Sequence, residues 1–418
     1  MLSSGAPTNM NSVAEALALV ARHAQPRPAA ETPVAEALGL ILAEDAASDV
    51  DSPPHDKSIV DGYAVVAADM ASGEAQLAIL EEVVAGSVPS LRVTNGKTTR
   101  IMTGAPLPEG ADAVVMIELS EIKASANSPL GDVQLSVDGL RPGQNILRRG
   151  ASFRRGEVVV RAGATLRAIE IGLLCEVGRV AVRAVPRPTV AILSTGNELV
   201  PPGDLPGPGQ IRNSNGPMLT AAVEQAGGRP IDLGAARDSR DVLRHSIASG
   251  LAADVLVLSG GVSAGVLDLV PGVLAELGVE QVFHKVRIKP GKPLWFGILA
   301  SGPAPKLVFG LPGNPVSSFV SFELFVRPAL AQLAGRGFNG LATCRAVLTH
   351  SFIHRGERPT YHPAVLRQSA AGATVEPLAW KGSADLRGLA AANALVQFPA
   401  GNRTFAAGET AEVLLLDV

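Results

Sequence analysis

Three times between Asp254 and Ser318, an apolar run ends in a loop of glycine, proline, serine and lysine. The runs and their loops are Val255–Leu258 before Ser259–Gly265, Val286–Ile288 before Lys289–Pro293, and Leu307–Phe309 before Gly310–Ser318. Strands that end in such loops leave backbone N–H groups free to hold an anion. Open α/β sheets bind ligands at the carboxyl ends of their strands. We therefore expect the three loops to line one edge of a sheet and to form an anion site there.

The region from Thr189 onward alternates strand-like with helix-like segments. The strand-like runs are 190–193 and 255–258, and the helix-like runs are 217–226, 269–277 and 319–334. Alternation of this kind predicts a parallel sheet with right-handed crossovers. The fold class is therefore multidomain α/β, with this sheet as its central domain.

The first half of the chain has a different pattern. Residues 12–24 have helical spacing behind a Ser12/Glu15 capping box, and residues 34–44 are a second helical candidate. Residues 51–140 contain short apolar runs between glycine and proline turns, which is typical of a compact β domain. The segment after them returns to longer apolar runs, so we expect it to complete a domain that the β domain interrupts.

A chain of 418 residues exceeds what one core usually organises. Glycine (44) and proline (31) exceed their usual combined share of about 12%, and aromatics make up only 4%, which suits many short strands and turns. The tail has short apolar runs between turns, so it should be a small β domain. We expect four domains: a helical and β N-terminal domain at 1–50 with 141–185, an inserted β domain at 51–140, an α/β domain at 186–335, and a C-terminal β domain at 336–418.

The charge pattern excludes several classes of partner. A net charge of −3 gives no polybasic field, so nucleic acid is not expected as a partner. Cys175 and Cys344 are isolated and the histidines are scattered, so no zinc or histidine-based site is predicted. The sequence has neither a signal-peptide pattern at its start nor about 18 uninterrupted apolar residues. We expect a cytoplasmic protein with no membrane partner.

The glycine-rich turn at 259–265 has two interpretations. Glycine lets the backbone approach a phosphate closely, but a generic strand-to-helix turn also needs it. Asp268 favours the phosphate site, because a carboxylate three residues after the turn can hold Mg²⁺ against phosphate oxygens. The alternative is a carboxylate that the dipole at a helix start stabilises.

The next two loops also suit an oxyanion. The prolines and glycine of Lys289–Pro293 hold two ammonium groups at a fixed spacing, and a charge-assisted bond contributes about 1.5 to 3 kcal/mol. A solvated lysine pair is the alternative. Ser317 and Ser318 lie where the next helix, predicted over 319–333, begins. Hydroxyl and N–H groups there can bind an oxyanion, although simple N-capping uses the same residues.

Six motifs together resemble one family. They are Asp61–Ala64, Arg100–Ala111, Ser194–Leu199, Ser259–Gly265, Lys289–Pro293 and Gly310–Pro315. In this order they resemble the molybdopterin molybdenumtransferases, the molybdenum insertase family that includes the gephyrin E domain. The likeness runs from about Ser12 to the C-terminus.

The resemblance implies a reaction and an assembly. Molybdate is inserted into the dithiolene of adenylylated molybdopterin, AMP is released, and molybdenum cofactor is formed. Mg²⁺ is the implied cofactor, and the metal-binding sulfurs belong to the pterin. An elongated homodimer is also implied, with a cleft between the sheet domain of one subunit and the inserted β domain of the other. The adenylyltransferase and molybdoenzymes are further candidate partners.

The resemblance also implies residue roles. The catalytic positions are Asp61, Thr103, Glu198, Lys289 and Lys292. The molybdate-binding positions are Lys292, Pro293, Ser317, Arg358 and Ser383, and the phosphate- and nucleotide-binding positions are Gly260, Gly261, Ser263, Gly265 and Asn314. The metal positions are Asp238 and Asp268. Without the resemblance, Asp61-Gly62 would be interpreted as a hairpin turn, and Arg358 and Ser383 as surface turns.

Two positions depart from the family pattern. Val266 and Ser152 stand where the family usually has acidic residues, so an altered homologue with weaker metal binding stays an alternative. A second alternative is a molybdopterin adenylyltransferase, which uses a similar Ser-Gly-Gly loop but is usually a single sheet domain. A third is a non-catalytic dimeric scaffold of the same fold, which would not require the anion-binding residues.

Overall fold

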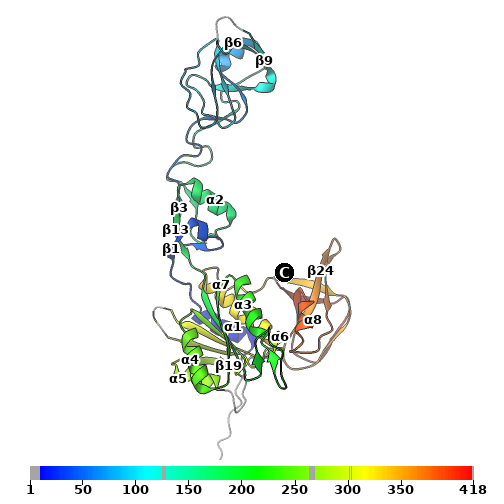
Figure 1. Cartoon of the computed structure of the whole chain (residues 1–418). Helices are drawn as coiled ribbons and strands as arrows, with labels where there is room; N and C mark the ends of the chain where they lie inside the picture. The colour runs from blue at the N-terminus through cyan, green and yellow to red at the C-terminus, as the bar shows by residue number, and fades with distance from the viewer. Residues whose placement is uncertain (1–9, 125–128, 263–268, 301, 303, 417–418) are drawn as a thin grey trace, which may run out of the picture.

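The computed structural model describes residues 10–124, 129–262, 269–300, 302 and 304–416. The molecule is elongated, with a β domain at one end and an α/β domain beside a barrel at the other (Figure 1). Among the described residues, no helix combines the length and the apolarity that a membrane crossing requires.

The α/β domain is built on a six-stranded sheet in the order β17-β14-β18-β21-β20-β19. Its strands are β14 (Thr189–Thr195), β17 (Arg229–Ala236), β18 (Val255–Ser259), β19 (Glu280–His284), β20 (Trp295–Leu299) and β21 (Lys306–Leu311). The first four strands in this order are parallel, whereas β20 pairs antiparallel with both β21 and the edge strand β19. The α/β class is confirmed, but the sheet is mixed and not wholly parallel as predicted.

Helices cover both faces of this sheet. They are α1 (Val13–His23), α3 (Asn215–Gln225), α4 (Arg240–Gly250), α5 (Val270–Glu276), α6 (Pro315–Ser321) and α7 (Arg327–Leu333), with a π-helical turn η4 (Phe322–Val326) between the last two. Apolar residues of α1, α3, α6 and α7 share one core with the sheet, and those of α4 and α5 share another. All residues of β18 are buried, as expected for a central strand covered on both faces.

Helix α1 departs from the predicted domain division. The predicted capping box is present, because Glu15 N donates to Ser12 Oγ at 3.2 Å and Ser12 N donates to Glu15 Oε2 at 2.7 Å. However, the buried face of α1, with Ala16 and Val20, packs in the core of the α/β domain. The N-terminal residues that follow α1 pair instead with strands outside the α/β domain. We propose a boundary near residue 28 and otherwise keep the four ranges predicted above.

The second predicted helix, over 34–44, is wrong. The segment forms one 3₁₀ turn, η1 (Val34–Glu36), and then the short strand β2 (Ile41–Leu42). Gly39, at φ +77°, separates the two because a helix cannot continue through a left-handed residue. Pairing with a distant strand then determines the conformation of residues 41–42.

The connecting region joins segments that lie far apart in the sequence. One sheet has the order β1-β13-β2, from β1 (Ala30–Pro33), β13 (Ala181–Val185) and β2, and two further pairs are β12 (Val158–Val160) with β3 (Ala46–Ala47) and β11 (Ile146–Leu147) with β4 (Lys57–Ser58). Helix α2 (Ala168–Glu176) packs on this region. Residues on both sides of the inserted β domain therefore share one small core.

The inserted β domain has a six-stranded sheet in the order β8-β5-β7-β6-β10-β9. Its strands are β5 (Gly62–Val65), β6 (Glu74–Val83), β7 (Lys97–Ile101), β8 (Ala113–Met116), β9 (Ser120–Lys123) and β10 (Asp132–Ser136), with the 3₁₀ turns η2 (Ala67–Met70) and η3 (Ile117–Leu119). Figure 1 shows this domain far from the α/β domain of the same chain.

The C-terminal residues form a closed barrel in the order β22-β25-β24-β26-β28. Its strands are β22 (Thr343–Leu348), β24 (Thr360–Ser369), β25 (Gly372–Pro377), β26 (Ala394–Phe398) and β28 (Thr410–Leu415); β23 (Phe352–His354) pairs with β27 (Arg403–Phe405), and α8 (Leu386–Ala390) is a short helix. The barrel contacts the α/β domain at α6, where Val316 N donates to Ser383 O at 3.0 Å.

Candidate functional site

The three loops lie at one edge of the sheet, as predicted, but one does so for a different reason. Strands β18 and β21 end at this edge with Ser259 and Leu311, and two of the loops continue from there. Residues 286–288 do not form a strand of the sheet. The loop Lys289–Pro293 reaches the edge because it precedes β20, which is antiparallel and begins with Trp295 opposite Gly310.

The turn at Gly260-Gly261 requires glycine at both positions. The φ angles are +95° and +63°, in the region that L side chains rarely adopt. A Cβ on Gly260 would lie 2.5 Å from Thr195 O, and one on Gly261 would lie 2.7 Å from Thr195 Oγ1. The turn therefore presses its backbone onto the end of β14. Predicted positions Ser263, Gly265, Val266 and Asp268 lie outside the described residues.

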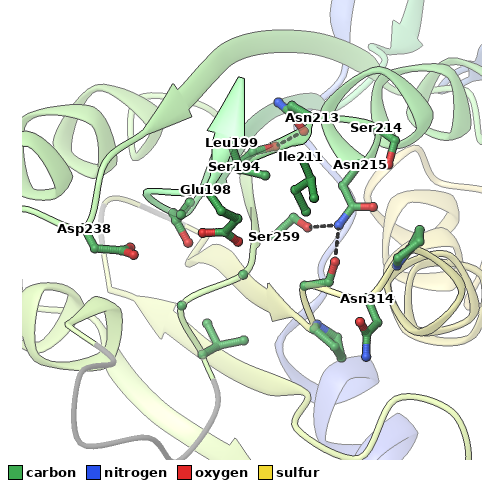
Figure 2. Close-up of a pocket in the computed structure, with 18 of the residues that line it drawn as sticks. Ser194, Glu198, Leu199, Ile211, Asn213, Ser214, Asn215, Asp238, Ser259 and Asn314 are labelled. Carbon is green, nitrogen blue, oxygen red and sulfur yellow. Dashed lines mark hydrogen bonds between the residues drawn. The ribbon is translucent and has the colours of Figure 1, made fainter. Parts of the chain in front are cut away.

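A cavity of about 500 Å³ opens beside this turn, and we call it the glycine-turn cavity (Figure 2). It contains six predicted residues: Glu198, Asp238, Gly260, Gly261, Pro293 and Asn314. Its walls also include neutral polar residues and one cation: Ser194, Thr195, Asn213, Ser214, Asn215, Ser259 and Arg212. The side chains of Glu198 and Asp238 point into the same part of the cavity in Figure 2.

Asn215 connects three elements of the glycine-turn cavity. Its Nδ2 donates to Ser259 Oγ at 2.8 Å and to Gly313 O at 2.7 Å. Since a carbonyl oxygen can only accept, the second bond fixes the orientation of the amide. Asn213 is also held, because Gly216 N donates to its Oδ1 at 3.1 Å. The sequence prediction missed both asparagines; their one local signal is their position at the start of a helix.

Ser383 reaches the glycine-turn cavity indirectly. Asn314 lines the cavity, and its Nδ2 donates to Ser383 Oγ at 2.9 Å. This contact brings the barrel to the rim of the α/β domain within one chain. Ser383 is therefore not an isolated surface turn, which was the alternative interpretation.

A second cavity, of about 420 Å³, lies on the other side of the lysine loop. We call it the cationic cavity; its lining is Met10, Arg287, Lys289, Lys292, Arg355, Gly356, Glu357 and Arg358. Three of the predicted site residues, Lys289, Lys292 and Arg358, thus meet there. Within the described part of the chain, none of its five cations takes part in an ion pair.

Backbone hydrogen bonds join the walls of the cationic cavity. Lys289 N donates to Pro359 O at 2.9 Å, and Tyr361 N donates to Lys289 O at 2.8 Å. Arg358 Nη1 donates to Ile288 O at 3.0 Å. These bonds hold the lysine loop of the α/β domain against the arginine loop of the barrel. They therefore bring the positive charges of both loops to the same cavity.

His362 lies behind the lysine loop, inside the barrel. Burial lowers the pKa of its imidazole, a contact with Leu378 O opposes that shift, and the charge of Lys289 lowers the pKa further. The ring packs edge-on against Trp380 with centroids 5.3 Å apart. The barrel wall near the cationic cavity therefore favours a neutral histidine.

Ser317 and Ser318 do not begin the helix as predicted. Helix α6 starts at Pro315, so both serines lie within it, 5% and 0% exposed, and neither lines the glycine-turn cavity or the second cavity described above. The lysine loop packs directly on this helix, because a Cβ on Gly291 would lie 2.7 Å from Ser321 Oγ and 3.9 Å from Ser317 O. Ser317 therefore lies in the first turn of α6, and its contact with an oxyanion stays a prediction.

Asp61 and Thr103 form a pair in the inserted β domain. Asp61 Oδ1 accepts from Thr103 N at 2.7 Å and from Thr103 Oγ1 at 2.8 Å. These bonds hold the pKa of the Asp61 carboxyl below its usual value. The alternative of a hairpin turn is wrong, because Gly62 begins β5, which pairs with β7 and β8. Within one chain the pair lies far from both cavities.

Ser152 also lies away from the two cavities. Its backbone N–H donates to Ser52 O at 2.9 Å in the connecting region, and it lines neither cavity. An acidic residue at this position would therefore not coordinate a metal in the glycine-turn cavity of the same chain.

Comparisons with known proteins cover the whole architecture. The MoeA N-terminal region (domains I and II) matches residues 11–178, the probable molybdopterin binding domain matches 191–332, and the MoeA C-terminal region (domain IV) matches 345–416. The molybdopterin molybdenumtransferase of Staphylococcus aureus (strain Mu50) is 33% identical over 413 residues, which is 97% of this chain and 95% of that protein.

The chain belongs to the MoeA family. A second relative, the molybdopterin molybdenumtransferase of Staphylococcus epidermidis, is 34% identical over 91% of this chain and 90% of its own length. The crystal structure of the molybdopterin biosynthesis MoeA protein from Pyrococcus horikosii superimposes with a TM-score of 0.80 at 34% identity, covering 98% of this chain and all of that one. The predicted family and the multidomain fold are confirmed.

Proposed function

We propose that this MoeA protein is a molybdopterin molybdenumtransferase, which inserts molybdate into adenylylated molybdopterin and releases AMP. The observation that carries this proposal is the adjoining pair of cavities, one lined by five cations and the other by a glycine turn and two carboxylates. A reaction between two oxyanions needs fixed donors and cations more than it needs an activated side-chain nucleophile.

The cationic cavity suits molybdate. Lys289, Lys292 and Arg358 can each make a charge-assisted bond to one of its oxygens. Pro293 shapes the loop, and Ser317 supports it from behind through the packing of Gly291 on α6. Ser383 acts through Asn314 on the neighbouring cavity. The positive charge without ion-paired acids favours a dianion over a neutral ligand.

The glycine-turn cavity suits the adenylyl phosphate. Gly260 and Gly261 have no side chains, so their backbone lies directly at its edge. Asn314 adds a side-chain amide at the start of α6. Release of AMP breaks one P–O bond of the phosphoanhydride, and an oxygen of molybdate or of water forms the replacing bond.

Mg²⁺ fits this cavity by the chemistry of its donors. Glu198 and Asp238 both line it, and Mg²⁺ is usually held by one or two carboxylates together with substrate phosphates. When bound, the ion would neutralise phosphate charge; Glu198 and Asp238 would orient it.

In the proposed function, Asp61 and Thr103 act at the site from the second subunit of a homodimer. Their own α/β domain lies at the other end of the elongated chain, so a second subunit must supply them if they act there (Figure 1). Mixing a Lys292→Ala chain with an Asp61→Asn chain tests this directly, because only a shared site would restore activity in the mixed dimer.

The central test is molybdate-dependent release of AMP from adenylylated molybdopterin. Loss of one charge-assisted bond, about 1.5 to 3 kcal/mol, should weaken molybdate binding about 10- to 100-fold in a Lys292→Ala variant. An exposed lysine elsewhere, Lys97, provides the matched control as Lys97→Ala. AMP release by Lys292→Ala at the unmutated rate and molybdate affinity would refute the assignment.

The same assay separates the alternative functions. An adenylyltransferase would transfer AMP from ATP to molybdopterin in the absence of molybdate. A non-catalytic scaffold would release no AMP. The family matches over residues 11–178 and 345–416 do not favour a single-domain adenylyltransferase, and the converging cations are not needed for a scaffold.

A further inference from the structure

The cationic cavity holds more positive charge and more space than molybdate requires. Arg287 and Arg355 line it together with the three residues proposed for molybdate, and Glu357 is its one lining carboxylate. Its volume of about 420 Å³ is on the order of ten waters, whereas a tetrahedral oxyanion takes the space of roughly three or four. One bound dianion would neutralise only part of the positive charge and would fill only part of the volume.

The two extra arginines are held in place by their loops. Arg287 N donates to Asn11 O at 2.8 Å, which fixes this residue against the N-terminal segment. On the barrel side, Gly356 N donates to Asn402 Oδ1 at 3.0 Å, and Gly401 N donates to Gly356 O at 2.8 Å. Arg355 therefore sits at the start of an anchored turn. Both loops meet across the backbone bridge at Lys289.

The nearby carboxylates do not neutralise these arginines. Glu15 interacts electrostatically with Arg287, but its Oε2 accepts from Ser12 N in the capping box of α1. Arg287 makes only a weak electrostatic contribution to the lowered pKa of Glu15. Glu357 is exposed and has no ion pair among the residues described. Unpaired guanidinium groups that converge in this way suit a phosphate, which they bind in planar, bidentate geometry.

We propose that Arg287 and Arg355 form a second oxyanion subsite in the cationic cavity, which binds a phosphate group of the pterin substrate while molybdate occupies Lys289, Lys292 and Arg358. The proposal rests on the proposed function, since it assumes that molybdate is the first anion. The phosphate is a different one from the adenylyl phosphate, which belongs to the glycine-turn cavity. The subsite would hold the pterin end of the substrate beside the metal it receives.

Equilibrium dialysis with molybdate and radiolabelled inorganic phosphate tests the proposal. Saturating AMP is included to fill the glycine-turn cavity. Bound molybdenum and bound radiolabelled phosphate are then counted per chain. We expect the total of bound oxyanions to fall by about one per chain in an Arg287→Gln/Arg355→Gln variant, with at least one molybdate retained. The control variant Arg161→Gln/Arg345→Gln removes the same charge at two exposed arginines outside the cavities and should keep the wild-type total.

Three results would overturn the proposal. They are a wild-type total of one oxyanion per chain, an unchanged total in the Arg287/Arg355 variant, and an equal loss in the control variant. AMP affinity should be the same in the wild type and in the Arg287/Arg355 variant; a loss of more than about tenfold, or about 1.4 kcal/mol, would contradict the placement of the adenylyl phosphate. If the proposed function were wrong, the wild-type protein would instead show no release of AMP that depends on molybdate.

Discussion

A Gly260→Ala substitution should destabilise the α/β domain and weaken nucleotide binding. Gly260 has φ +95°, and a Cβ there would lie 2.5 Å from Thr195 O, a backbone atom that cannot rotate away. The left-handed conformation costs about 1 to 2 kcal/mol for an L residue. Overpacking a tight site adds about 1 to 3 kcal/mol. We therefore expect a loss of about 2 to 5 kcal/mol, a large fraction of the 5 to 15 kcal/mol typical of a domain.

Urea unfolding followed by the fluorescence of Trp295 measures this loss. Trp295 is 1% exposed and shares a core with Val262, next to the turn, so its emission reports on the α/β domain. A Trp380→Phe background removes the other tryptophan signal. The domain should be treated separately from the rest of the chain, because a multidomain protein does not unfold in one two-state step.

Gly272→Ala is the matched control. Gly272 lies in α5, and a Cβ there would meet no atom within 4 Å. Alanine is favoured over glycine in a helix by about 0.5 to 1 kcal/mol, so this variant should be neutral or slightly more stable. AMP affinity should fall at least tenfold in Gly260→Ala only. If Gly260→Ala unfolded at the same urea concentration as Gly272→Ala and bound AMP normally, the role assigned to the glycine turn would be refuted.

Three further substitutions test other parts of the structure. Asn215→Leu removes the bonds to the buried Ser259 hydroxyl and to the Gly313 carbonyl, so the Trp295 transition should lose about 1 to 3 kcal/mol; an unchanged transition would contradict the bridging role. Glu198→Gln should raise the Mg²⁺ concentration needed for AMP release about tenfold, in contrast to the exposed Asp241→Asn, because one anionic ligand is lost; equal Mg²⁺ curves would exclude Glu198 as a ligand. Burial lowers the folded-state pKa of His362, so its stabilising contribution is complete above the unfolded value of about 6.5 and is lost as the pH falls below it. His362→Gln should therefore reduce the loss of barrel stability between about pH 7.5 and about pH 5.5, measured by Trp380 fluorescence, and an unchanged pH dependence would show that other groups control it.

Local signals predicted the elements whose causes are local. Helix α1 has its capping box within four residues, and the structure contains both reciprocal bonds. The shared edge of the two loops after β18 and β21 was also predictable, because a buried apolar run followed by a glycine turn is visible in the sequence. These features depend on residues close together along the chain.

Long-range contacts explain the errors. Val286 and Ile288 are fully buried in the core of the α/β domain, so their pattern resembles a strand, yet Val286 forms an isolated bridge with Asn11 of the N-terminal segment, and the adjacent Lys289 forms one with Thr360 of the barrel. Residues 41–42 form a strand because β13, far along the chain, pairs with them. Asn215 was missed because its partner Gly313 lies 98 residues away. Contacts of this kind cannot be inferred from periodicity in one sequence.

The position of the lysine loop explains how cations and carboxylates coexist at one site. Lys292 lines the cationic cavity, whereas the next residue, Pro293, lines the glycine-turn cavity. Neighbouring Cα atoms are about 3.8 Å apart, so the partition between the cavities is one residue thick at this point. Without it, Glu198 and Asp238 could pair with the lysines and cancel the charge that each cavity offers to its own ligand. The loop is held by Gly291 against α6 and by Lys289 against the barrel, so the separation does not depend on flexible side chains. An oxyanion on one side can therefore lie close to a phosphate on the other while each keeps its own set of charged groups.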